Sequence, residues 1–214
     1  ITVDQFRYLA FLVEDVAALQ VNQDLFKRYT KKLGYGLARR QDTYMSAFVT
    51  NLANNVGTLG QELAPDDYLE AIRILQSLGV FAENGNNKDD FSIFLSPKEY
   101  VALMRQPEFN NRDVNSAADS IQKFSVGKVY GMPVYTSNLL TTNGVGVDNT
   151  LKHRDAMVFA VQKEYKVDSD RLLEKIGVGV VAYSVYGGGV LNFAPETAAG
   201  GAETANRGIH LKAT

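Results

Sequence analysis

Apolar and polar residues alternate over residues 1–13, where β-branched and aromatic residues are also frequent. This pattern predicts a β-strand that ends at the acidic pair Glu14-Asp15. Asp15 then suits the N-cap of a following helix, because its carboxylate can accept a hydrogen bond from the free amides of the first turn.

The period becomes helical from residue 16 to residue 53, a stretch without proline. Apolar residues recur every seven positions, at Leu12, Leu19, Phe26 and Leu33. We therefore predict one amphipathic helix, roughly 55 Å long at 1.5 Å per residue. Gly34 and Gly36 each cost about 1 kcal/mol in a helix relative to alanine. Their presence predicts a kink or a close approach of another segment.

The middle of the chain reads as helix, strand and helix. Pro65 suits the first position of a helix, and Gly79 suits the left-handed position after its end. Residues 91–95 alternate as a strand. Ser96 and Glu99 form the pattern of a capping box, which predicts a second helix from Pro97 to about Arg105.

Most of the remaining chain is predicted as strand. The predicted strands are 126–129, 134–137, 156–163, 178–186, 189–193 and 208–212. Gly187-Gly188-Gly189 lies between two of them, where glycine permits a positive φ, a bulge, close backbone packing or a flexible hairpin turn. Residues 54–60 are predicted as a break, and residues 198–206 as a loose connection. The fold class that follows is α+β with one long helix.

Composition narrows the class of protein. Of the 214 residues 45% are hydrophobic and 21% are charged, and the formal net charge is −2, which is ordinary for a globular protein and does not favour a dedicated nucleic-acid binder. There is no cysteine, so disulfides and thiolate chemistry are excluded. No run approaches the ~18 apolar residues of a membrane span, so we predict no membrane partner. The chain begins at Ile1 without methionine, and we interpret it as a processed or trimmed piece of a longer chain.

No catalytic motif stands out. His153 and His210 lie in different segments without the three or four convergent ligands that a metal needs, so we interpret both as structural or surface residues. Arg154-Asp155 is interpreted as a local turn or interface contact. Gly144-Val145-Gly146 lacks the rest of a dinucleotide fingerprint. We therefore predict no enzyme, no cofactor and no metal.

One charge feature stands out on the predicted helix. Six basic residues occur with no acidic residue between Leu25 and Gln41, namely Lys27, Arg28, Lys31, Lys32, Arg39 and Arg40. At 100° per residue, all except Arg40 fall in a sector of about 140°. Lys27, Arg28, Lys31, Lys32 and Arg39 are thus candidates for contact with a DNA backbone, for a subunit interface, or for a simple solvated face.

Several short motifs occur in an order that resembles the major capsid proteins of tailed bacteriophages. They are Ile1-Thr2-Val3-Asp4 before Phe11–Asp15, Tyr35–Arg39 with Asp42, Phe94–Pro97, Val129–Tyr135, Ser137-Asn138, His153–Ala156, Tyr186-Gly187 and Pro195-Glu196. Each motif is weak alone, and their order over about 200 residues carries the resemblance. The implied fold is the Hong Kong 97-like capsid fold, which encapsulin shells share, with a long spine helix on an antiparallel sheet.

The resemblance implies a domain organisation. Residues 1–58 and 141–214 would form a peripheral domain with the spine helix and long sheet, and residues 59–140 an axial α/β domain. The family's N-terminal arm and extended loop would precede residue 1, so we expect apolar surface to be left uncovered on this chain.

The resemblance also implies a function. The chain would self-assemble into hexamers and pentamers of an icosahedral shell around double-stranded DNA, in the virion capsid assembled in the host cytoplasm. Its partners would be its own copies, with scaffold, decoration and portal proteins. The alternatives are an encapsulin-like shell protein and a nucleic-acid-binding protein that uses the basic face of helix 16–53.

Overall fold

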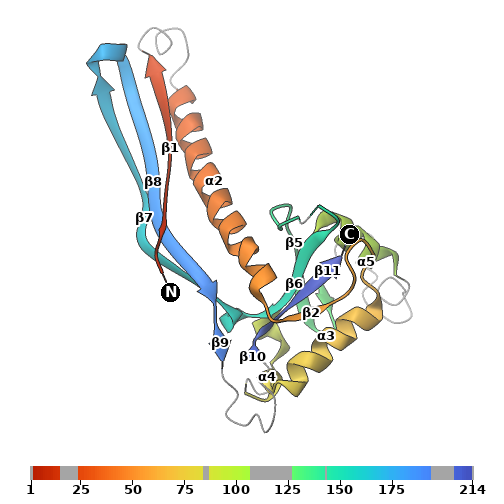
Figure 1. Cartoon of the computed structure of the whole chain (residues 1–214). Helices are drawn as coiled ribbons and strands as arrows, with labels where there is room; N and C mark the ends of the chain where they lie inside the picture. The colour runs from red at the N-terminus through yellow and green to blue at the C-terminus, as the bar shows by residue number, and fades with distance from the viewer. Residues whose placement is uncertain are drawn as a thin grey trace. The chain divides into compact units, whose positions relative to one another are not determined.

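The structure, a computed structural model, describes residues 2–14, 24–83, 87–106, 127–142, 144–193 and 205–213. The chain divides into two compact units (Figure 1). Unit 1 comprises Ile1–Met45 and Phe159–Gly189, and unit 2 comprises Ser46–Val158 and Val190–Thr214. The peripheral and axial domains stay a prediction. Strands on both sides of residues 59–140 belong to the sheet of unit 2.

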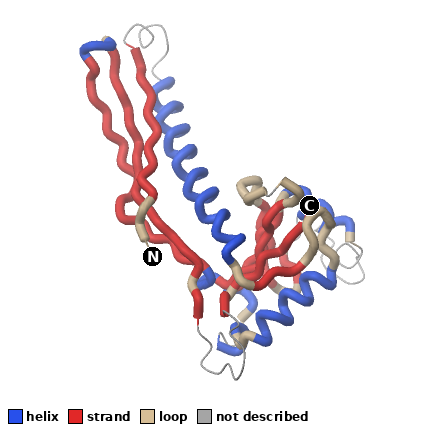
Figure 2. Tube along the Cα trace, viewed as in Figure 1, coloured by secondary structure: helices blue, strands red, loops and turns tan. Residues whose placement is uncertain are grey.

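Unit 1 is a helix layered on a three-stranded sheet of order β1-β8-β7 (Figure 2). Its elements are β1 (Gln5–Glu14), α2 (Asp24–Ala47), β7 (Met157–Leu172), the short helix η4 (Leu173–Lys175) and β8 (Gly177–Val190). β1 runs antiparallel to β8, with register from Gln5 opposite Tyr186 to Glu14 opposite Gly177. The two ends of the chain thus build one sheet from residues more than 160 positions apart.

The long helix is confirmed, with different bounds. α2 has 24 residues, about 36 Å, and the 3-10 helix η1 (Phe48–Asn51) follows it. The start predicted at residue 16 and the N-cap at Asp15 lie outside the described residues. α2 is helical throughout, including at Gly34 and Gly36. The expected close approach of another segment occurs at Gly36, where an added Cβ would lie 2.7 Å from Leu9 Cδ1.

The core of unit 1 is small. Leu33 and Leu37, one helical turn apart, face Val180 and Ala182 of β8, and Leu9, Phe11 and Val178 pack around them. Leu33, one of the apolar residues spaced seven apart that predicted the helix, therefore lies on its buried side.

Unit 2 is built on a six-stranded mixed sheet of order β2-β11-β6-β3-β5-β4. Its strands are β2 (Asn54–Val56), β3 (Phe91–Leu95), β4 (Lys128–Val129), β5 (Met132–Thr136), β6 (Val147–His153) and β11 (Gly208–Ala213). β2 is parallel to β11 and β3 is parallel to β5, whereas the other pairs are antiparallel. Separately, β9 (Asn192–Phe193) pairs with β10 (Ala205–Asn206).

The predicted helices of the middle region are confirmed. The helical segments of unit 2 that follow η1 are α3 (Pro65–Ser77), α4 (Val80–Glu83), η2 (Lys88–Asp90), α5 (Pro97–Arg105) and η3 (Arg154–Ala156). Pro65 opens α3, and Gly79 has φ 73° just after it. Ser96 caps α5, because its hydroxyl accepts from Glu99 N at 3.2 Å. The capping box predicted a hydrogen bond from the Ser96 amide to the Glu99 carboxylate. Instead, the Ser96 amide donates to Asn149 Oδ1, and the Glu99 carboxylate accepts from Leu63 N.

Several strand predictions need correction. Residues 187–189 do not form a turn but lie inside β8, which is continuous from Gly177 to Val190. Close packing explains Gly187, where an added Cβ would lie 2.2 Å from the backbone oxygen of Thr2, but not Gly189, where it would meet nothing within 4 Å. β7 extends nine residues beyond the predicted end at 163, to Leu172. β2, β6 and β10 were not predicted: β2 lies in the predicted break 54–60 and β10 in the predicted loose connection 198–206. None of the helices in the described ranges is long and apolar enough to cross a membrane.

Candidate functional site

The two faces of unit 1 differ in chemistry. The helix turns Leu33 and Leu37 inward, so residues about 180° away on α2 point to solvent. The sheet likewise presents alternate residues to the helix and to its opposite face. Unit 1 therefore has one face made by α2 and one made by the side of the sheet that α2 does not cover.

The face made by α2 is basic. The five basic residues singled out from the sequence are all exposed, namely Lys27, Arg28, Lys31, Lys32 and Arg39. Within the described part of the chain, none of these five side chains forms an ion pair with a carboxylate. Lys32 Nζ lies 5.8 Å from the ring centre of Tyr29, a contact that leaves its charge available. We call these five residues the basic face.

Arg40 is turned away from the others, as its helical position predicts. It lies towards Tyr186 of β8, whose pKa is raised by burial and lowered in part by the charges of Arg7 and Arg40. Tyr186 also contacts the Tyr44 ring edge-on at 5.4 Å. Arg40 therefore belongs to the packed side of the helix and not to the basic face.

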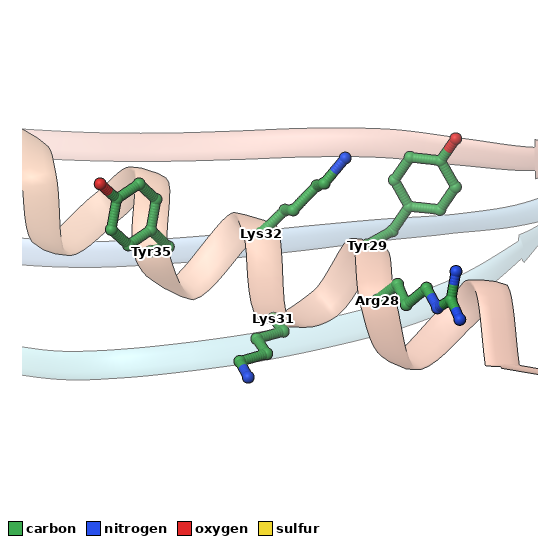
Figure 3. Close-up of a pocket in the computed structure, with 5 residues that line it drawn as sticks. All are labelled: Arg28, Tyr29, Lys31, Lys32 and Tyr35. Carbon is green, nitrogen blue, oxygen red and sulfur yellow. The ribbon is translucent and has the colours of Figure 1, made fainter.

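An open pocket of about 540 Å³ lies along the basic face. It is lined by Arg28, Tyr29, Lys31, Lys32 and Tyr35, all from α2 (Figure 3). In this view Lys31 and Lys32 point towards opposite edges of the basic face. The Tyr35 side chain is 70% exposed and the Tyr29 side chain 41%. The pocket thus combines three fixed positive charges with two phenol hydroxyls, a set of groups suited to binding anions.

The tyrosines were missed in the sequence, although a signal was present. Tyr35 falls at the centre of the same 140° sector as the basic residues when 100° per residue is applied. Tyr29 falls about 60° outside that sector, on the side towards β1, where its ring is 5.4 Å from that of Phe11.

The opposite face of the sheet is apolar along β1 and β8, but charged side chains of β7 reach Tyr183 on it, where Lys163 Nζ donates to the Tyr183 hydroxyl at 3.0 Å. Three cross-strand pairs of β1 and β8 lie on it: Phe6 with Val185, Tyr8 with Tyr183 and Ala10 with Val181. Several large side chains there are exposed, with Phe6 at 58%, Tyr8 at 63%, Leu12 at 37% and Val181 at 37%. The Phe6 ring is 6.1 Å from that of Tyr8 and 6.0 Å from that of Tyr183. We call Phe6, Tyr8, Leu12 and Val181 the apolar face. The expectation of uncovered apolar surface is confirmed.

The two histidines belong to the interior of unit 2. His210 Nε2 lies 2.8 Å from Asp148 Oδ1, and His153 Nδ1 accepts from Asp155 N at 3.2 Å. Burial lowers the pKa of His153, against the raising effect of Asp155. Arg154-Asp155 forms the local turn η3, as expected. Among the residues that the structure describes, no three His, Asp or Glu side chains are grouped as metal ligands.

The fold is shared with solved structures. A structure from Mycobacterium phage Che8 is similar, with TM-score 0.73 and 18% identity over 97% of this chain and 70% of that one. The capsid of cyanophage P-SCSP1u gives TM-score 0.72 and 16% identity, over 99% and 73% of the two chains. A virus-like particle from Pyrococcus furiosus gives TM-score 0.58 and 10% identity, over 97% and 76%. The α+β fold is therefore the Hong Kong 97-like capsid fold, as the sequence predicts.

The family is given by the sequence itself. A family model described as phage capsid protein matches residues 1–199, and the chain belongs to that family. No curated protein matches the chain.

Proposed function

We propose that this chain is a major capsid protein whose copies associate into hexamers and pentamers of an icosahedral shell enclosing double-stranded DNA. The observation that carries the proposal is the apolar face of unit 1 in a member of the phage capsid protein family. Contiguous apolar surface of this kind marks an interaction site on a protein.

The energetics of unit 1 support association. Four buried residues form its core among those described, and small units with little buried apolar surface gain little stability alone. Covering Phe6 and Tyr8 with another subunit would add about 25 cal/mol for each Å² removed from water. Many such contacts, repeated around closed rings, make a stable assembly from modest interfaces.

The domain roles are part of the proposal. Residues 1–58 and 141–214 act as the peripheral domain, and residues 59–140 act as the axial domain at the centre of each ring. The role is structural and not enzymatic, and the chain resides in the virion capsid after assembly in the host cytoplasm. Scaffold, decoration and portal proteins are its expected partners besides its own copies.

An encapsulin-like shell is the second candidate, favoured by the similarity of fold to the virus-like particle from Pyrococcus furiosus. The two candidates differ in content. A phage capsid holds nuclease-resistant double-stranded DNA, whereas an encapsulin-like shell holds protein cargo. Nuclease digestion of purified particles followed by extraction separates the two.

The test compares two double variants by electron microscopy and light scattering. Phe6→Ser with Tyr8→Ser removes apolar area from the apolar face and should abolish rings and shells, because subunit contacts there lose their buried surface. The control, Leu69→Ser with Tyr135→Ser, changes side chains of similar exposure in unit 2, at 47% and 52%.

We expect the control to assemble. If the unaltered full-length protein stays a compact monomer, with or without scaffold, the proposed function is wrong. If the Phe6 and Tyr8 variant assembles as well as the control, the apolar face is not the interface.

A further inference from the structure

We propose that the basic face of α2 binds the phosphate backbone of double-stranded nucleic acid without sequence preference. The identity of that nucleic acid as packaged DNA rests on the proposed function, but the binding itself does not. The first support is the chemical contrast within unit 1, where the apolar face suits a protein neighbour and the basic face does not. Lysine is depleted at protein–protein interfaces, and three of the five cations of the basic face are lysines.

The spacing of the charges fits a linear polyanion. Lys27 and Arg39 are twelve residues apart, so the row spans about 18 Å along the helix axis. Lys27 and Lys31, and likewise Arg28 and Lys32, are four residues apart, about 6 Å along the axis, and Arg39 follows about 10 Å after Lys32 with Tyr35 between them. An array of this kind neutralises several phosphates together and releases their counterions.

The lining of the pocket fits the same ligand. Phosphate contacts in protein–DNA complexes come from Arg and Lys and also from Tyr hydroxyls. Arg28 can donate two parallel hydrogen bonds to one phosphate group. The exposed hydroxyl of Tyr35 lies among these charges and can donate a further one. Because the lining offers no base-reading geometry, the contact is expected to be independent of sequence.

No carboxylate within this stretch of α2 competes for the charges. The sequence from Leu25 to Gln41 contains neither Asp nor Glu. An acidic protein segment is the main rival partner, since it would also be attracted to the face. The basic face would recognise its carboxylates by their charge alone. The experiment below distinguishes an acidic protein segment from nucleic acid.

The experiment measures binding of a fluorescent 30-base-pair duplex of mixed sequence to the purified full-length chain, by anisotropy across a series of KCl concentrations. The test variant is Arg28→Gln, Lys31→Gln and Lys32→Gln. The control variant removes the same charge from exposed positions elsewhere, as Lys98→Gln, Arg105→Gln and Lys175→Gln.

We expect the test variant to bind at least about tenfold more weakly at low salt. The slope of log affinity against log salt should fall by about 2 to 3, because each phosphate contact contributes about 0.9. The control should keep the affinity and slope of the unaltered chain. Equal binding by the test variant and the unaltered chain would overturn the proposal.

Two further measurements separate the alternatives. Poly-glutamate of matched charge should compete weakly with the duplex; if it binds to the unaltered chain while the duplex does not, the partner is an acidic protein and the proposal fails. In the unaltered chain, bound duplex should protect Lys27, Lys31 and Lys32 from acetylation. Uniform labelling at saturating DNA would also contradict the proposal, without relying on any variant.

Particle formation is scored in parallel. If the test variant no longer binds DNA but still forms shells, the proposed function stands. If the unaltered chain binds DNA but forms no shell, DNA binding by the basic face stands and the proposed function is wrong.

Discussion

Unit 2 encloses its apolar residues, whereas unit 1 leaves many of its own uncovered. Seventeen buried apolar residues form one cluster in the described part of unit 2, with α3, α4 and α5 packed on its sheet. The corresponding cluster of unit 1 has four, all at the interface of α2 and β8. The large exposed apolar side chains of β1, including Phe6 and Tyr8, lie on the side of the sheet that α2 does not cover.

This difference shows where the stability of each unit comes from. Unit 2 has the core of a small domain and can be stable by itself. Unit 1 is two layers thick and has the smaller core, so a molecule that covered its apolar face would stabilise it, because binding to the folded state alone favours that state.

The largest effect should come from truncating the two cores in turn. Ile93 is fully buried between Val134 of β5 and Leu151 of β6, and Ile93→Ala should lower the free energy of unfolding by about 3 to 5 kcal/mol. Leu37→Ala should cost less, about 2 to 3 kcal/mol, because its half-exposed neighbours can partly fill the cavity. Denaturant titration with hydrogen exchange resolves the two units.

The comparison has a matched control. Leu69→Ala changes a residue of α3 that is 47% exposed, so it should stay within about 0.5 kcal/mol of the unaltered chain. In assembled particles the cost of Leu37→Ala should shrink relative to that of Ile93→Ala. An equal cost for the two core variants would show that unit 1 is not the weaker unit.

The next effect concerns pH and affects unit 2, which contains both histidines. Burial lowers the pKa of His153 from its usual 6.5. The unfolded chain therefore binds more protons than the folded chain below about pH 6.5, and stability falls as the pH drops through that value. Thermal unfolding at pH 7.5 and 5.5 measures the loss.

His153→Asn provides the comparison, because its side-chain oxygen can replace Nδ1 as acceptor from the Asp155 amide. We expect the variant to lose less stability than the unaltered chain between the two pH values. Its pH dependence should match that of the unaltered chain between pH 7.5 and 8.5. If both proteins lose stability equally on acidification, carboxylates and not His153 cause the loss.

The smallest expected effect is a difference in stability between alanine substitutions at the two glycines of α2. Gly34→Ala should stabilise unit 1 by about 0.5 to 1 kcal/mol, since alanine favours a helix and its Cβ would meet nothing within 4 Å. Gly36→Ala gains the same propensity but crowds Leu9, so the net change should be close to zero. Thermal unfolding of the two variants tests the difference. A larger gain for Gly36→Ala would place the close contact elsewhere.

The basic face could be predicted from the sequence because it needs only helical geometry. Once residues 24–47 form a helix, positions 27, 28, 31, 32 and 39 share one side and Arg40 falls outside it. The apolar face could not be predicted residue by residue. Phe6 and Tyr8 become neighbours of Val185 and Tyr183 only through the register of β1 with β8.

The strand β6 shows a second limit. Its residues Asp148, Asn149 and Thr150 are polar, which argues against a central strand, yet all three are buried. Partners far along the chain satisfy them: His210 for Asp148, the Ser96 amide for Asn149 and the Ile209 carbonyl for Thr150. A pattern of hydrophobicity carries no information about such partners.

By itself, the sequence determined the long helix, the helix–strand–helix order of the middle region, the basic side of α2 and the capsid fold that its ordered motifs resemble. The helices, their order and the basic side follow from local spacing, because helical and extended chains repeat with fixed periods, whereas the capsid fold rests on the resemblance of the motifs to a known family. The tertiary structure decided which strands pair, how far β7 and β8 extend, and which face of the sheet is left uncovered. Those features depend on contacts between residues far apart in the chain, and no local period encodes them.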